Sequence, residues 1–112
     1  MYASLFEIKS WLGTDQYIFE GESASEMLSQ FENVQSLECL VEMGRSHERS
    51  KSGKQAIDDL EKMLEKHYSD ELEIEDLLKF DIKISLGEMR CITVVEGDDA
   101  IAQLRAEYPK AR

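Results

Sequence analysis

Apolar residues recur with two different periods along this chain, and this change of period constrains its fold more than any other feature. In residues 6–12 and 80–86 apolar and polar side chains alternate, which is typical of a half-buried β-strand. In residues 24–31 and 57–68 the apolar side chains instead lie three or four positions apart, which is typical of an amphipathic helix. The chain is therefore predicted to combine strands with helices.

The first strand is expected to turn back on itself and then to lead into a helix. Residues 13–15 (Gly-Thr-Asp) predict a turn, and residues 17–19 predict the returning strand of a hairpin. Ser23 and Glu26 have the spacing of a capping box, in which two side chains bond the free N–H groups at the start of a helix. We therefore expect a short helix after residue 23.

The middle of the chain predicts a third strand, a loop and a long helix. The strand over residues 37–43 is indicated by four alternating apolar residues, Leu37, Cys39, Val41 and Met43, and it is expected to end at Gly44. Residues 44–54 (GRSHERSKSGK) hold no apolar side chain, so they predict an exposed loop. Residues 54–68 predict the longest helix of the chain, with one solvated face.

The last third of the chain predicts two more strands and a final helix. Residues 69–78 fit either a strand or one helical turn, and we favour a short helix. Residues 80–86 predict a strand, and residues 89–95 predict a central strand because their apolar side chains point to both faces. Asp98 is expected to cap a helix whose inward side chains are Ile101, Leu104 and Tyr108.

Two segments far apart in the chain resemble each other. Residues 6–13 are FEIKSWLG and residues 80–87 are FDIKISLG, and each is expected to open a hairpin whose second strand ends in Glu-Gly before a helix. The resemblance predicts two ββα units that share one sheet. Chance convergence is the alternative, because strands and glycine turns draw on few residue types.

These elements predict a single α+β domain over residues 1–112, since a chain of this length supports one hydrophobic core. The predicted architecture is a two-layer sandwich with a mainly antiparallel five-stranded sheet and helices on one face. No secretion signal and no apolar stretch of membrane-spanning length is present, so a cytoplasmic protein is expected. Cys39 and Cys91 lack the short spacing of a metal or redox motif and are expected to be buried free thiols.

The sequence predicts no enzyme and no cofactor, because no catalytic combination of residues is evident. His47 is expected in the exposed loop, and His67 is expected to pack on the apolar side of the long helix. A zinc site built from these histidines and the two cysteines is disfavoured, because the cysteines come from different predicted strands and lack a short paired spacing. An enzyme that uses the histidines or the basic loop remains a third hypothesis.

The charge predicts a binding protein. Acidic residues outnumber basic ones by 24 to 13, which gives a formal net charge of −11 and a field that repels nucleic acid and anionic lipid. A cluster of carboxylates is expected to dock a basic protein surface, in the manner of small inhibitors, immunity proteins or nucleic-acid mimics. Its members are Asp70, Glu71, Glu73, Glu75 and Asp76.

The alternative function is a homodimeric ligand-binding or regulatory domain. Two features suggest it: strand edges that could pair with a second copy, and an anion site where the basic loop over residues 44–54 meets a helix N-terminus. The residues of that site would be Arg45, His47, Arg49, Lys51 and Lys54.

Overall fold

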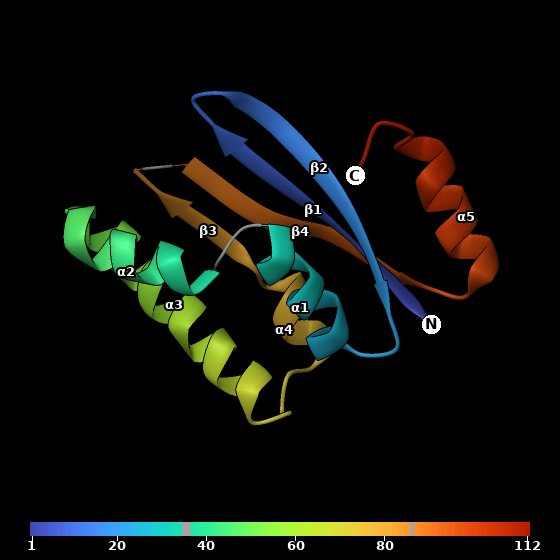
Figure 1. Ribbon diagram of the computed structural model, residues 1–112, viewed down its shortest axis with the longest axis horizontal. Helices are drawn as coiled ribbons and strands as arrows, with labels where there is room; N and C mark the ends of the chain where they lie inside the picture. The colour runs from blue at the N-terminus through green and yellow to red at the C-terminus, as the bar shows by residue number, and fades with distance from the viewer. Residues whose placement is uncertain (35–36, 86) are drawn as a thin grey trace.

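The computed structural model describes residues 1–34, 37–85 and 87–112, with the backbone alone for residues 31–34. Strands and helices follow one another in nine elements of the described chain (Figure 1). In order they are β1 (Tyr2–Ser10), β2 (Gly13–Gly21), α1 (Ala24–Val34), α2 (Leu37–His47), α3 (Lys51–Tyr68), α4 (Ile74–Leu78), β3 (Asp81–Ile84), β4 (Gly87–Glu96) and α5 (Asp98–Glu107). The predicted α+β class is confirmed.

The described strands form one antiparallel sheet in the order β2-β1-β4-β3. Two hairpins, β1–β2 and β3–β4, therefore lie side by side, and β1 pairs with β4 in the centre. The pairing of β1 with β4 shifts register between Leu5 and Phe6, as at a β-bulge. The prediction of β4 as a central strand is confirmed, whereas the prediction of five strands is wrong.

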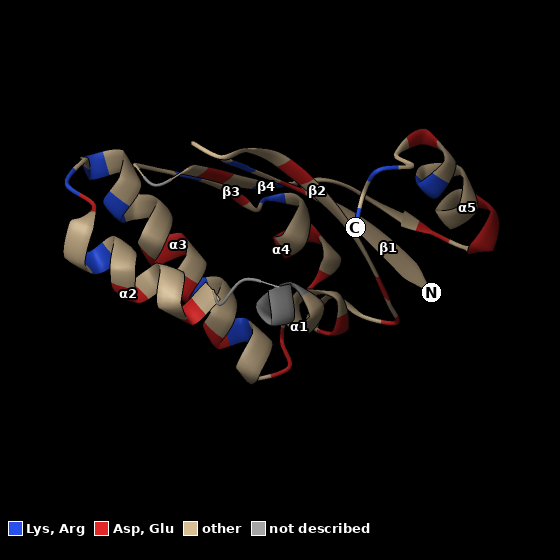
Figure 2. Cartoon of the chain, turned by 45° about the horizontal axis from the view of Figure 1, so that its top comes forward, with Lys and Arg blue, Asp and Glu red and all other residues tan. Residues whose placement is uncertain are grey.

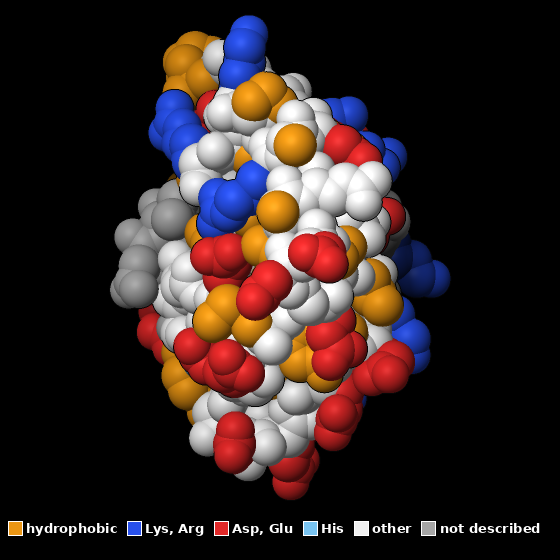
Figure 3. All heavy atoms as spheres, turned by 90° about the vertical axis from the view of Figure 1, so that its right-hand side faces the viewer, with side chains coloured by type: hydrophobic (Ala, Val, Ile, Leu, Met, Phe, Trp, Pro, Cys, Tyr) orange, Lys and Arg blue, Asp and Glu red, His pale blue; other side chains and the backbone are white. Residues whose placement is uncertain are grey.

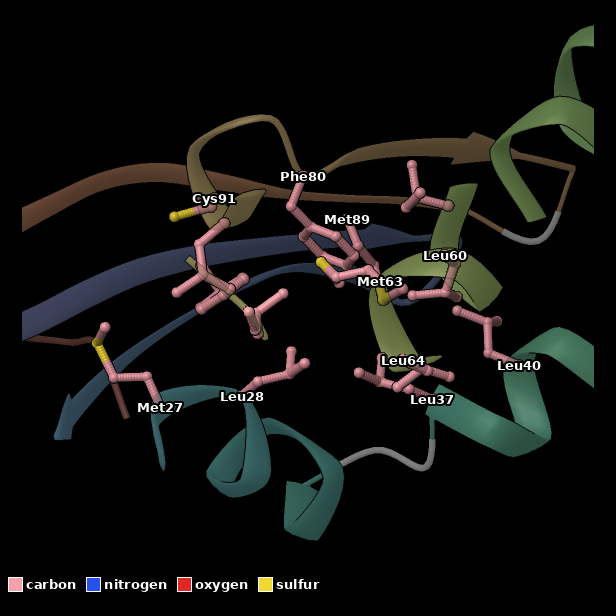
Figure 4. Close-up of a cluster of buried hydrophobic side chains, with 14 of the residues drawn as sticks. Met27, Leu28, Leu37, Leu40, Leu60, Met63, Leu64, Phe80, Met89 and Cys91 are labelled. Atoms are coloured by element: carbon pink, nitrogen blue, oxygen red, sulfur yellow. The ribbon is translucent and has the colours of Figure 1, made fainter. Parts of the chain in front are cut away.

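Side chains on the two faces of the sheet enter two separate cores. One face contributes Phe6, Tyr17 and Phe19 to a core that is covered by α1 to α4. Figure 4 shows part of this core, with Met27, Leu28, Leu37, Leu40, Leu60, Met63, Leu64, Phe80, Met89 and Cys91 pointing toward one another. The opposite face packs a smaller set against α5, namely Ala3, Leu5 and Ile18 with Ile101 and Leu104. Helices on one face only were therefore the wrong expectation, because α5 covers the other face.

The expected strand over residues 37–43 is wrong, and these residues belong to α2. Alternation and helical spacing compete here, since Leu37, Leu40, Val41 and Gly44 lie three or four positions apart, and these four residues are buried. Gly44 does not end a strand; it lies where α2 crosses α3. A Cβ atom at this position would lie 2.3 Å from Cδ1 of Ile57, so only glycine allows this close approach.

The expected loop over residues 44–54 is also wrong, because its two ends are helical. Residues 44–47 complete α2, and Lys51 begins α3, which leaves residues 48–50 as the connection. Ser50 is the N-cap of α3, and its hydroxyl accepts a hydrogen bond from the backbone N–H of Gly53 at 3.0 Å. An absence of apolar residues indicated a loop, whereas the capping serine marked a helix start.

The predicted ββα repeat is not confirmed. The segment 6–13 runs through the central strand β1, whereas the matching segment 80–87 runs through β3 at the edge of the sheet. The helices that follow the hairpins, α1 and α5, pack against opposite faces. The two matching phenylalanines do meet, since the rings of Phe6 and Phe80 lie 5.7 Å apart edge to face.

Several local predictions are confirmed with small shifts. The hairpin forms, but Ser10 pairs with Gly13, so the turn consists of Trp11 and Leu12. The backbone N–H of Glu26 donates to the hydroxyl of Ser23 at 3.2 Å, as expected for the cap of α1. The short helix α4 is present, and Gly97 takes the N-cap of α5 in place of Asp98. Among the described residues no helix is both long and apolar enough to cross a membrane.

The edge strands are partly covered by contacts from other segments. On β2, the carbonyl of Gln16 accepts a hydrogen bond from the backbone N–H of Arg112 at 2.9 Å. The carbonyl of Glu20 accepts from the side-chain amide of Gln30 in α1. The other edge, β3, spans Asp81–Ile84 and packs beside α3. Both edges of the sheet therefore have neighbours along part of their length.

Candidate docking surfaces

The acidic cluster, Asp70, Glu71, Glu73, Glu75 and Asp76, lies on the connection between α3 and α4 and on the first turn of α4. Asp70, Glu71, Glu73 and Glu75 are exposed, and Asp76 is half-buried. Figure 2 shows acidic residues on this connection below α3. The structure therefore brings the predicted residues together in one short stretch of surface.

Two members of the acidic cluster, Glu73 and Asp76, form the capping box of α4. Asp76 accepts a hydrogen bond from the backbone N–H of Glu73 at 2.9 Å, which caps α4. It also pairs with Lys66 of α3, whose Nζ lies 3.0 Å from the carboxylate. The hydrogen bond from Glu73, with the help of Lys66, lowers the pKa of Asp76. Asp76 and Glu73 are thus engaged within the chain, and Asp70, Glu71 and Glu75 are more available to a partner.

A second group of acidic residues lies at the end of the sheet where β2 and β4 stop. Both strands are antiparallel to β1, and Tyr2 pairs with Gly21 on one side and with Glu96 on the other. The ends of the two strands therefore flank β1 at the same end. We call the acidic residues there the acidic sheet end: Glu20, Glu22, Glu96, Asp98 and Asp99.

The sequence analysis did not identify the acidic sheet end as a site. The signal was present, because both hairpins end in Glu-Gly, but the strand order that brings the two pairs together was not predicted. Asp98 and Asp99 also occupy the first turn of α5, where negative charge is stabilised by the helix dipole.

Most carboxylates of these two groups lack a cationic partner within the described chain. Glu20 pairs with Arg105 at 3.2 Å, and Glu22 pairs with the N-terminal amino group at 3.6 Å. Seven others form no ion pair with any described residue: Asp70, Glu71, Glu73, Glu75, Glu96, Asp98 and Asp99. Figure 3 shows the side that carries α5, where Asp and Glu occupy much of the lower half and Lys and Arg lie mainly in the upper half and along the right edge.

The basic residues predicted as an anion site are spread over two helices and their connection. Arg45 of α2 pairs with Glu61 and Asp58 of α3, and the hydrogen bond from Arg45 to Glu61 raises the pKa of Arg45. His47 is exposed at the last position of α2. Arg49, Lys51 and Lys54 are exposed and form no ion pair with the described residues.

A buried carboxylate occupies the space beside this basic segment. Glu48 is 5% exposed, and one of its oxygens accepts hydrogen bonds from the backbone N–H and the hydroxyl of Ser50 at 3.2 and 2.8 Å. Its other oxygen accepts from the backbone N–H of Ser85 at 2.7 Å. Gly53 leaves room for this carboxylate, since a Cβ there would lie 2.3 Å from Cδ of Glu48.

The hydrogen bonds to Glu48 have an electrostatic consequence. The backbone N–H of Ser85 and the hydroxyl of Ser50 lower the pKa of Glu48 to about 2, because they stabilise the ionised form. The chain thus supplies its own anion at the start of α3. The sequence analysis gave Glu48 no role, and no local pattern indicated its contact with Ser85, which lies 37 positions away.

The cysteines and His67 lie on separate elements. Cys91 is buried in β4 as expected, and burial raises the pKa of its thiol to about 12. Cys39 is exposed on α2, so its expected burial is wrong. His67 is half-buried near the end of α3, with its ring 5.2 Å from that of Tyr68. Among the described residues no group of three His, Cys, Asp or Glu side chains is arranged to hold a metal ion.

Comparisons of this chain with protein-family models, with curated proteins and with solved structures found no match.

Proposed function

We propose that this chain is a small non-enzymatic protein-binding module that docks a basic surface of a partner protein. The contact is made by the acidic cluster together with the acidic sheet end. One observation carries the proposal: seven carboxylates in these two groups have no ion-pair partner among the described residues. Unpaired surface charges of one sign speed encounter with an oppositely charged surface and select against wrong partners.

The lowered pKa values of three carboxyl groups support a binding role over catalysis. Glu7, Glu48 and Asp76 all have a pKa below the ordinary value, because each accepts hydrogen bonds from its own chain. A general acid or base at neutral pH needs a pKa raised toward neutrality, which is the opposite direction. These three carboxyl groups therefore stabilise the fold and are poorly suited to proton transfer at neutral pH.

The homodimeric ligand-binding alternative has less support. Its anion site would lie at the N-terminus of α3, where Glu48 already accepts the N–H and hydroxyl of Ser50. An incoming anion could reach these donors only by displacing this carboxylate. Strand pairing of β2 with a second copy would have to displace the contacts that Gln30 and Arg112 make with this strand.

The proposal is tested with a charge-neutralised variant and a matched control. Glu71→Gln, Glu75→Gln and Glu96→Gln together remove three charges from the two acidic groups. Glu42→Gln, Asp59→Asn and Glu107→Gln remove the same number from exposed positions elsewhere. Each tagged protein serves as bait in cell extract, captured proteins are eluted with rising salt, and the affinity of the principal partner is measured by calorimetry.

The expected result is a partner with a basic contact surface that elutes as ionic strength rises. Its affinity should fall at least about tenfold with the first variant, since several charge pairs are lost, and should change little with the control. Equal affinity for both variants would show that net charge alone attracts the partner. A partner whose binding is insensitive to salt would contradict the proposal.

A further inference from the structure

The turn of the first hairpin carries two large apolar residues that the fold does not require. Trp11 is 89% exposed and Leu12 is 79% exposed. The positive φ of this turn falls on Gly13, at 129°, so polar residues would serve equally well at positions 11 and 12. Tryptophan is enriched among the residues that dominate protein interfaces. Its exposure at this turn therefore suggests a contact with another molecule.

A groove lies beside this turn, lined by residues of both hairpins. It has a volume of about 680 Å³, and its apolar lining consists of Ile8, Trp11, Leu12, Tyr17 and Ile84. We call this set the hairpin-tip groove. A smaller cavity of about 60 Å³ adjoins it and shares Ile8 and Ile84. The two hairpins approach closely here, because a Cβ on Gly87 would lie 2.3 Å from the carbonyl oxygen of Lys9. The groove is therefore built on paired strands and is formed before a ligand arrives.

Beside the groove, the charges without an ion-pair partner among the described residues are two cations, Arg49 and Lys51, and the buried carboxylate of Glu48, a net charge of +1. The acidic residues that line the groove are already paired, Asp15 with Arg112 at 3.8 Å and Glu88 with Lys83 at 3.5 Å. Ser85, which also lines the groove, is bonded to Glu48, and the neighbouring Arg49 and Lys51 have no ion-pair partner among the described residues. The strand β1 places this surface about 26 Å from the acidic sheet end, at roughly 3.3 Å per residue.

We propose that the hairpin-tip groove is a second docking surface, which takes a short acidic peptide segment of a partner protein with one large apolar side chain in the groove. The apolar side chain packs against Trp11, Leu12 and Ile84, and the carboxylates of the segment approach Arg49 and Lys51. The aliphatic side chains of Ile8 and Ile84 suit a protein side chain better than a stacked base. A long nucleic acid would also be repelled by the net charge of −11, whereas a short peptide carries few charges.

The proposal is tested by selecting, from a display library of random twelve-residue peptides, those that bind the whole chain. We expect the enriched peptides to be acidic and to share one Leu, Phe or Trp. The best synthetic peptide should bind Trp11→Ala at least about tenfold more weakly than the parent chain, as for an interface residue that dominates binding. Arg49→Ala with Lys51→Ala should weaken binding several-fold at low salt.

Two control variants and an oligonucleotide arm complete the test. Leu78→Ala removes an exposed apolar residue from α4, and Lys110→Ala removes an exposed cation, and both should leave peptide affinity unchanged. Circular dichroism should show that Trp11→Ala keeps its melting temperature. The proposal is overturned if no peptide is enriched, if the enriched peptides are neutral or basic, or if they bind Trp11→Ala as tightly as the parent. Tighter, Trp11-dependent binding of a twelve-nucleotide single strand would assign the groove to nucleic acid instead.

Discussion

At the scale of single residues, Glu48 shows how one buried charge is accommodated. Its oxygens accept hydrogen bonds from Ser50 and from the backbone N–H of Ser85, so the charge is solvated by the chain and not by water. The contact joins the start of α3 to the turn between β3 and β4. Glu48 therefore ties the helical layer to the end of the sheet beside the hairpin-tip groove.

The pKa of Glu48 predicts how stability depends on pH. Its folded pKa is about 2, against an ordinary value of 4.5 for the unfolded chain, so its contribution is fully present above pH 4.5 and is lost as the pH falls toward 2. Glu48→Gln should lower the melting temperature at neutral pH by about 4–8 °C, because the neutral amide leaves donors poorly paired. The difference between parent and variant should shrink between pH 4.5 and pH 2.

Thermal melts followed by circular dichroism at several pH values measure this effect. Glu42→Gln is the control, because Glu42 is exposed on α2 and accepts no hydrogen bond from the described residues. It should leave the melting temperature unchanged. A difference between the parent and Glu48→Gln that stays constant down to pH 2 would contradict the assigned role of the carboxylate.

At the scale of elements, the packing of α2 on α3 depends on Gly44. This glycine faces Ile57, which is buried in the main core, and its missing side chain allows the two helices to approach. Glycine inside a helix costs about 1 kcal/mol relative to alanine. The close contact offsets this cost, since a Cβ at position 44 would overlap Cδ1 of Ile57.

A double-mutant cycle tests this contact. Gly44→Ala should destabilise the domain by about 1–2 kcal/mol, because overpacking outweighs the gain in helix propensity. Ile57→Ala should cost about 2–5 kcal/mol through the cavity it leaves. The double variant should be more stable than the sum predicts, by about 0.5–2 kcal/mol, because the new methyl group fills part of that cavity. Urea unfolding of the four proteins gives these values, and strict additivity would place Gly44 outside the contact.

The parts of the fold that could be predicted from the sequence are those with one clear local pattern. Strands β1 and β3, the long helix α3 and the cap at Ser23 follow from local patterns and are confirmed. The segment 37–43 fits both periods, and only its packing on α3 decides for a helix. The approach of Glu48 to Ser85 and the grouping of the Glu-Gly strand ends depend on contacts between distant segments. Neither is encoded in a local pattern.

At the scale of the whole molecule, the sheet separates two cores of unequal size. The larger core lies under α1 to α4, and the smaller one is closed by α5 through Ile101 and Leu104. Alternate residues of β1 and β2 enter both cores, so the sheet is buried on both faces near the acidic sheet end. Few contacts hold α5 on the sheet, so α5 can detach by local unfolding without disturbing the main core.

Hydrogen exchange should therefore distinguish α5 from the rest of the domain. We expect the amides of residues 98–107 to exchange faster than those of β1, because α5 opens on its own. Leu104→Ala should raise exchange further in α5 while leaving α3 little changed. Mass spectrometry of deuterium uptake measures both effects. Equal protection of α5 and β1, or a uniform rise across the chain, would show a single cooperative unit.

The contacts on the outer side of β2 bear on how the molecule behaves when crowded. An unsatisfied strand border is a template on which further chains can add and grow into fibrils. Here the carbonyls of Gln16 and Glu20 are already occupied by Arg112 and Gln30. An incoming chain would find a broken row of acceptors, and the mutual repulsion of anionic molecules would slow its arrival. Fibril growth from the β2 edge should therefore be slow even in concentrated solutions.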